Sequence, residues 1–229
     1  MKLCIIGYGK MGKALHRLAP QYGFSDFVII DNEEDWISKQ HDFKSCDIAI
    51  EFSMPQTALG NLSKCFEMQI PVVSGTTGWD VETGRAPSLH NVPVSFIYGS
   101  NFSIGANIFF KLNEWLAQQM NRQPNYAASI EETHHIHKKD APSGTALTIE
   151  QSILSQLDHL INIPIISHRE GEIVGEHLVN YDSVEDLIQI KHSVHTRDAF
   201  AHGALKAAAW LVKNPGIYAF ENIFDRVMM

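Results

Sequence analysis

The chain has 229 residues, 45% of them hydrophobic, which is enough for one large domain or for two smaller domains with separate cores. Its 18 basic and 26 acidic side chains give a formal net charge of −8, and no stripe of Lys and Arg is visible. This balance argues against nucleic acid as a partner, because nucleic-acid binding needs clustered cations. No stretch approaches the ~20 apolar residues of a membrane span, and the apolar N-terminal run is too short for a signal peptide. We therefore expect a cytoplasmic protein with no membrane partner.

The amino-terminal half alternates between strand and helix patterns. Buried parallel strands are predicted at the apolar runs 3–6, 27–30, 48–52, 71–74 and 94–98. Apolar residues at helical spacing follow the first run, through Met11, Leu15 and Leu18, and recur over 57–68. This alternation predicts a parallel sheet covered by helices. Cys4, Cys46 and Cys65 show no CxxC spacing, and we expect free, buried thiols in a reducing compartment.

Gly7, Gly9 and Gly12 form a GxGxxG sequence directly after the first predicted strand. Gly7 permits a tight turn, Gly9 lets the backbone approach a pyrophosphate, and Gly12 lets the following helix pack closely on the strand. Tyr8 lies in this turn, and Lys10 and Met11 begin the helix that follows it. The N-terminus of that helix then faces the phosphates. The motif also occurs by chance, but its place in a βαβ unit favours a dinucleotide site.

Asp31 stands at the end of the second predicted strand, where it is placed to accept hydrogen bonds from an adenosine ribose. The alternative is an ordinary polar residue at a strand end. The next residue is Asn32 and not the arginine that a 2′-phosphate would favour, so the sequence predicts NAD. Lys10 and Lys13 offer partial compensation for a 2′-phosphate.

Two polar turns follow later strands of the same sheet. They comprise Gly75, Thr76, Thr77 and Gly78, and then Gly99, Ser100, Asn101 and Phe102. Either turn alone is typical of a simple loop. Because the carboxyl ends of parallel strands line the ligand crevice, the two together predict the site of the cofactor's ribose and nicotinamide end. A third and weaker candidate is the segment 53–55.

The second half loses this alternation. Helices are predicted over 108–120, 145–157 and 201–212, and strands over 127–132, 163–166, 176–181 and 187–194. Leu112, Trp115 and Leu116 are expected on the apolar side of the first of these helices. The pattern predicts an α+β domain with a mixed sheet, while 201–212 and the apolar segment 220–227 return to the first domain. His168, Arg169 and His177 flank a glycine-rich segment, which we interpret as a turn with surface charges.

The segment 131–146 gathers three imidazoles and two ammonium groups beside a predicted helix start, with Glu131, Glu132 and Asp140 expected to orient or cap. Histidines and lysines can donate protons to an anion or hold one. Ser143, a plausible helix cap, and the two residues after it offer hydroxyls and backbone N–H groups, where carboxylates bind readily. Zinc is the alternative ligand, but no cysteine completes a site, so we expect no metal. Solvated surface histidines are the other alternative.

The chain resembles the 4-hydroxy-tetrahydrodipicolinate reductase family, also called the dihydrodipicolinate reductase family, over essentially its whole length. The most specific match is His134-His135-x-His137-Lys138-x-Asp140-Ala141-Pro142-Ser143-Gly144-Thr145-Ala146. Matching segments in the right order are the fingerprint 7–12, 75–78, 101–105, 173–177 and 200–204. The resemblance implies that hydride passes from NADH or NADPH to a cyclic dicarboxylate in lysine biosynthesis.

The resemblance also implies roles for individual residues. His134 would be the acid/base group and Lys138 the proton donor, while His135, Ser143, Gly144 and Thr145 would hold a substrate carboxylate. It implies a Rossmann-like dinucleotide-binding domain at 1–102 and 203–229, a substrate-binding and oligomerisation domain at 103–202, and a homotetramer. The chain departs from longer members in a shorter fingerprint turn, the missing arginine and a short segment 166–171. Alternatives are a dehydrogenase of another small carboxylic acid, a non-catalytic NAD-binding module and a zinc hydrolase.

Overall fold

The computed structural model describes residues 1–79, 94–158 and 161–229, and the chain divides into two compact units. Unit 1 comprises Met1–Ser103 and Arg197–Met229, and unit 2 comprises Ile104–Thr196. The chain returns to unit 1 earlier than the expected residue 203. The reason is that helix α8 (Asp198–Leu211) is continuous and packs against α1 (Lys10–Leu18) of unit 1.

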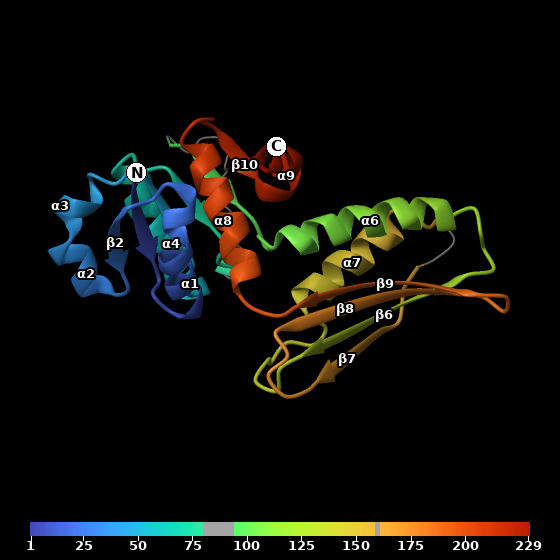
Figure 1. The fold of residues 1–229 in the computed structure, drawn as a ribbon. Helices are drawn as coiled ribbons and strands as arrows, with labels where there is room; N and C mark the ends of the chain where they lie inside the picture. The colour runs from blue at the N-terminus through green and yellow to red at the C-terminus, as the bar shows by residue number, and fades with distance from the viewer. Residues whose placement is uncertain (80–93, 159–160) are drawn as a thin grey trace. The chain divides into compact units, whose positions relative to one another are not determined.

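Unit 1 is built on a six-stranded parallel sheet with the strand order β10-β5-β4-β3-β1-β2 (Figure 1). The strands are β1 (Lys2–Ile6), β2 (Asp26–Ile30), β3 (Ile48–Glu51), β4 (Val72–Ser74), β5 (Phe96–Tyr98) and β10 (Ile217–Ala219). The described helices are α1, the short 3-10 turn η1 (Ala19–Tyr22), α2 (Glu33–Ser38), α3 (Gln40–Phe43), α4 (Pro55–Glu67), α8 and α9 (Phe220–Met228). All five strand pairings are parallel, so the predicted parallel sheet covered by helices is confirmed.

The core of unit 1 explains why the apolar runs form strands. Leu3, Cys4, Ile5 and Ile6 are 0–1% exposed, because helices cover both faces of the sheet. The three cysteines are free and buried, as expected. The strand β10 and the short helices α2 and α3 escaped prediction, since three to six residues are too few to show a period.

Unit 2 carries a four-stranded mixed sheet with the order β7-β6-β8-β9. The strands are β6 (Ala127–His134), β7 (Ile165–Arg169), β8 (Gly175–Asp182) and β9 (Leu187–Val194). Strand β6 is parallel to β7 and antiparallel to β8, and β8 is antiparallel to β9. Helices α6 (Ile104–Met120) and α7 (Gly144–Leu154) lie side by side over one face of this sheet (Figure 1).

Two details of the prediction for unit 2 are wrong. Leu112 and Trp115 are 45% and 57% exposed, whereas Leu116 is buried as predicted, together with Phe109 and Met120, against the sheet and α7. Helix α6 is apolar around most of its circumference, so its period alone does not identify the face that packs. Strand β7 also starts two residues later than the predicted run, and Ile163 is buried in the core ahead of it.

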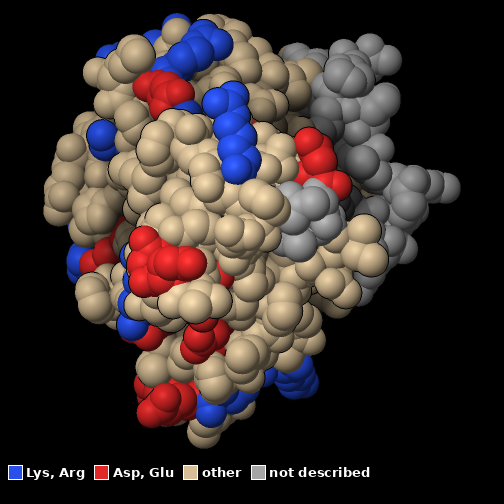
Figure 2. Space-filling model, turned by 90° about the vertical axis from the view of Figure 1, so that its right-hand side faces the viewer, with Lys and Arg blue, Asp and Glu red and all other residues tan. Residues whose placement is uncertain are grey.

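Charge is distributed without a single dominant sign on the face drawn in Figure 2. Acidic and basic side chains of the described residues are interspersed there. No helix within the described ranges is long and apolar enough to span a membrane.

Candidate nucleotide site and acid/base cluster

The fingerprint turn has the geometry that its glycines require. Gly7 has φ of +88°, and a Cβ there would lie 2.1 Å from the backbone oxygen of Phe52. A Cβ on Gly12 would lie 2.1 Å from the oxygen of Gly7, so only glycine allows α1 to begin this close to β1. Gly9, the residue before α1, has open space around it. The turn therefore presents its backbone and a helix N-terminus to an unobstructed volume, as a pyrophosphate site needs.

Asp31 is joined to this turn. The backbone N–H of Tyr8 donates a 2.6 Å hydrogen bond to Oδ1 of Asp31. Asn32 does not face outward as a free amide, because its Oδ1 caps α2 by accepting from the N–H of Asp35 (3.0 Å). A cavity of about 510 Å³ opens beside these residues, and its lining includes Gly7, Tyr8, Gly9 and Asp31. Its size lies in the range of small-molecule sites.

The two later turns meet at a second, smaller cavity of about 200 Å³. Its lining combines residues from both turns, namely Thr76, Thr77, Gly78, Gly99 and Ser100. Asn101 and Phe102 lie outside this lining: the Oδ1 of Asn101 accepts from the N–H of Ser103 (2.9 Å), and Phe102 is buried. Lys10 and Met11, in the first turn of α1, line neither of these cavities.

A buried carboxylate that the sequence analysis overlooked organises the strand ends. Glu51, the last residue of β3, is fully buried and accepts hydrogen bonds from the hydroxyls of Ser53, Ser74 (2.6 Å) and Thr76 (2.8 Å). The backbone N–H of Ser53 donates to it as well (3.0 Å). Glu51 thus ties together the ends of β3 and β4 and the Thr76 turn. The available signal was an acidic residue at the end of an otherwise apolar strand.

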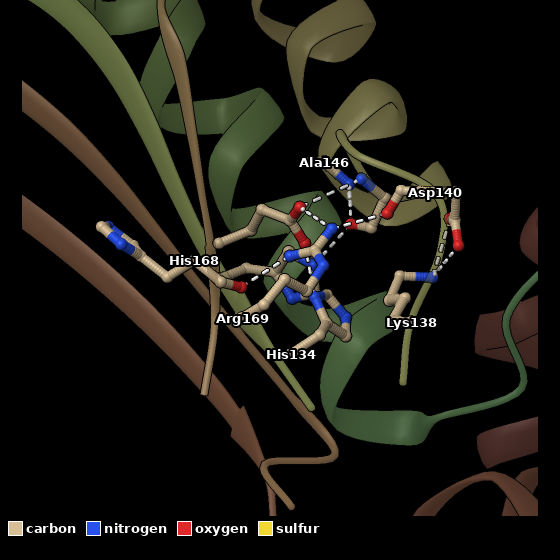
Figure 3. Close-up of polar contacts among 9 residues, drawn as sticks. His134, Lys138, Asp140, Ala146, His168 and Arg169 are labelled. Atoms are coloured by element: carbon tan, nitrogen blue, oxygen red, sulfur yellow. Dashed lines mark hydrogen bonds and ion pairs between the residues drawn. The ribbon is translucent and has the colours of Figure 1, made fainter. Parts of the chain in front are cut away.

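In unit 2, His134 is held by a carboxylate. Its Nδ1 contacts Oε2 of Glu132, two residues earlier on β6, and both side chains are buried. The other oxygen of Glu132 lies 2.9 Å from Nη2 of Arg169, on the neighbouring strand β7 (Figure 3). Burial alone would raise the pKa of Glu132, but hydrogen bonds from Ser167, Arg169 and Ser143 lower that pKa to about 2. Glu132 is therefore a fixed anion that orients the imidazole.

His177 completes the cluster from β8. Its ring centroid lies 5.2 Å from that of His134, and its Nε2 lies 3.2 Å from the hydroxyl of Ser143. That hydroxyl also accepts from the N–H of Ala146 (3.2 Å), so Ser143 caps α7 as predicted. Burial, and then the charge of His134, lower the pKa of His177 to about 4. The expectation that Arg169 and His177 are surface charges is therefore wrong.

The remaining expected residues surround this cluster. Lys138 forms an ion pair with Asp140 at 2.7 Å, and Figure 3 shows the two side chains facing each other. His135 is partly buried with its ring 6.0 Å from that of His137, while Gly144 and Thr145 begin α7. Burial lowers the pKa of His134, the opposing effect of Glu132 is smaller, and the charge of Lys138 lowers that pKa further.

The cluster also bears on the metal alternative. Donor atoms of Glu132, His134 and His177 lie within 4.8 Å of one another. The guanidinium of Arg169 already binds the same carboxylate, and a second cation there would face its positive charge. The donor set therefore fits an oriented imidazole better than a metal centre.

Taken together, a fingerprint turn on a parallel sheet and a carboxylate-held imidazole define an oxidoreductase of the dinucleotide-dependent class. Residues 1–102 match the N-terminal part of dihydrodipicolinate reductase and residues 105–224 match its C-terminal part. The chain belongs to the dihydrodipicolinate reductase family, whose enzymes are NAD(P)H-dependent and act in lysine biosynthesis.

Named relatives match this sequence over nearly its full length. It is 39% identical over 98% of both chains to the 4-hydroxy-tetrahydrodipicolinate reductase of Christiangramia forsetii, and 33% identical over 94% of both to that of Xylella fastidiosa. A solved dipicolinate-bound dihydrodipicolinate reductase from Paenisporosarcina sp. TG-14 shares the fold with a TM-score of 0.71 at 22% identity. The match covers 97% of this chain and 99% of that one.

Proposed function

We propose that this chain reduces 4-hydroxy-tetrahydrodipicolinate to tetrahydrodipicolinate and water, with His134 and Lys138 as its proton-handling groups and NADH as its preferred cofactor. The reaction consumes one hydride and one proton, and the hydroxyl leaves as water. The bound nicotinamide supplies the hydride. The observation that carries the assignment of residues is the buried Glu132–His134 pair on the same unit as Lys138.

The geometry supports a specific role for His134. Its Nδ1 is engaged by Glu132, which leaves Nε2 as the atom that can exchange a proton. The lowered pKa favours a neutral imidazole near pH 7, so we assign the role of the cation that faces the substrate to a lysine of the segment, Lys138. Hydride addition leaves negative charge on a conjugated substrate, and a nearby ammonium stabilises that charge as it forms.

The start of α7 supports a carboxylate site. The backbone N–H groups of Gly144 and Thr145 lie in its first turn, where the helix dipole favours an anion. Ser143 contributes differently from the sequence-based expectation, because the residue is buried and its hydroxyl is already bonded to Ala146 and His177. We therefore assign carboxylate binding chiefly to the backbone of this turn and to His135.

The cofactor assignment follows from Asp31 and the two strand-end turns. A carboxylate fixed by Tyr8 suits the two ribose hydroxyls of NADH and opposes a 2′-phosphate. Asp31→Ala is expected to weaken NADH binding more than NADPH binding in a fluorescence titration. An unchanged ratio of the two dissociation constants would remove Asp31 from the ribose site.

We also propose a homotetramer assembled through the sheet of unit 2, which rests on the family resemblance. Light scattering is then expected to give about 103 kDa, four times the 25.7 kDa chain.

A coupled assay tests the reaction. Dihydrodipicolinate synthase generates the substrate in place, and nicotinamide absorbance is followed with NADH and with NADPH in separate runs. Oxidation that depends on the synthase supports the proposal, and the ratio of the two kcat/KM values measures the preference. Folded protein that binds NADH but oxidises neither cofactor would mean that the substrate is a different one.

A further inference from the structure

The larger cavity of unit 1 contains an ion pair that neither the fingerprint nor Asp31 explains. Lys64, on α4, places its Nζ 2.7 and 2.8 Å from the two carboxylate oxygens of Glu33, the first residue of α2. Both residues line the cavity beside Asp31. The same ammonium lies 4.8 Å from the ring centroid of Trp36, another lining residue.

The charges around this cavity are unbalanced. Of the described residues that line it, Lys64 alone is cationic, whereas Asp31 and Glu33 are both anionic. The nearby Lys39 is not in the lining, because its Nζ is engaged by Asp35 (2.6 Å) and by the backbone oxygen of Ile29 (2.8 Å). A 2′-phosphate entering here would therefore meet two carboxylates and a lysine that is already neutralised.

The ion pair contributes little to folding. The side chain of Glu33 is 74% exposed and that of Lys64 is 30% exposed. Exposed pairs of this kind typically stabilise a protein by about 1 kcal/mol or less. Replacing Glu33 therefore changes the charge of the cavity without threatening the fold.

We propose that Glu33 is a specificity-determining residue that restrains Lys64 and thereby disfavours NADPH. Asp31 selects for the ribose through hydrogen bonds, and Glu33 excludes the 2′-phosphate by charge. Without Glu33, Lys64 becomes a free ammonium at the rim of the cavity, and phosphate groups bind such a point charge readily. The inference rests on the proposed nucleotide site and adds to it the residue that sets its charge.

Calorimetric titration of the full-length protein tests this role with defined probes. Glu33→Gln is titrated with NADH, NADPH, 5′-ADP and 2′,5′-ADP. We expect NADPH and 2′,5′-ADP to bind roughly 3- to 10-fold more tightly than to the wild type, the size of one or two charge contacts near a surface. The affinities for NADH and 5′-ADP should change by less than about twofold, since neither carries the 2′-phosphate.

Two further variants isolate the cause. Glu34→Gln removes a negative charge one residue further along α2, from a side chain outside the cavity lining. This variant should leave the affinities for NADH and NADPH unchanged. The double variant Glu33→Gln with Lys64→Gln should lose the gain, because the freed ammonium is gone. The gain should also shrink in about 0.5 M salt, which screens exposed charges.

The outcomes distinguish the role of Glu33 from the nucleotide site itself. If wild-type protein binds NADH tightly but Glu33→Gln leaves the NADPH-to-NADH ratio unchanged, the role of Glu33 is wrong and the nucleotide site stands. An equal gain in Glu34→Gln would also overturn it, because net charge alone would then be the cause. Wild-type protein that binds neither NADH nor 5′-ADP would overturn the nucleotide site and this inference with it.

Discussion

A Cβ atom on Gly175 would lie 3.0 Å from Nε2 of His134, so the start of β8 leaves the imidazole the space that a side chain would otherwise fill. Nε2 is the nitrogen that Glu132 leaves free. The absence of a side chain at Gly175 therefore leaves room for the ring on one side, while Glu132 holds it on the other. The two contacts come from different strands, β8 and β6.

Gly175→Ala is expected to displace the imidazole and to lower kcat by about 10- to 100-fold, since small misplacements of reacting groups are costly. The affinity for NADH should not change, because unit 1 holds the nucleotide site. Steady-state kinetics and nucleotide titration of the same preparation measure both. Wild-type kcat in a correctly folded variant would show that the ring has room to move.

Glu132→Gln is expected to lower kcat by about 10²–10⁴-fold, because the amide neither orients His134 as an anion does nor balances Arg169. The carboxylate of Glu132 raises the pKa of His134, so its loss should lower that pKa further. The His134 resonance in an NMR titration and the pH profile of kcat report this shift. An unchanged profile with reduced kcat would indicate a merely structural carboxylate.

Lys138→Ala is expected to reduce turnover by about 10²-fold or more, because the variant loses its proton-donating ammonium. The neighbouring exposed Lys139 provides a matched control, and Lys139→Ala should retain nearly wild-type kcat. NADH affinity should be the same in both variants. Parallel loss of turnover and nucleotide binding in Lys138→Ala would contradict the assigned role.

The stability of the protein should fall on acidification between pH 6.5 and about 4.5. His177 accepts a proton near pH 6.5 when unfolded but only near pH 4 when folded, so falling pH favours the unfolded chain. The full stabilisation exists above pH 6.5, and the complete difference corresponds to about 3 kcal/mol. Glu132, with its lowered pKa, adds to this trend only below about pH 4.5.

Urea unfolding across this pH range measures the effect. The free energy of unfolding of the wild type should decrease steadily from pH 6.5 to 4.5, and His177→Gln should reduce the slope. Lowered pKa values of His134 and His192 leave part of the slope in the variant. An identical slope in the two proteins would show that His177 is protonated alike in the folded and unfolded states.

Features encoded within a few neighbouring residues could be predicted from the sequence. The glycine fingerprint, the buried parallel strands and the Ser143 cap each follow from local geometry, and all appear in the structure. The segment 134–146 was identified because its chemistry is contiguous. Helix faces were less predictable: α6 exposes Leu112 and Trp115 because which apolar side packs depends on the sheet and on α7.

By itself, the sequence determined the class of fold, the nucleotide fingerprint and the histidine–lysine segment, because these depend on short-range spacing. The tertiary structure alone decided which groups surround His134. Arg169 and His177 reach it only because β6 pairs with β7 on one side and with β8 on the other. Glu33 and Lys64 likewise meet across 31 residues of chain. Such contacts depend on strand order and register, which no local pattern of residues encodes.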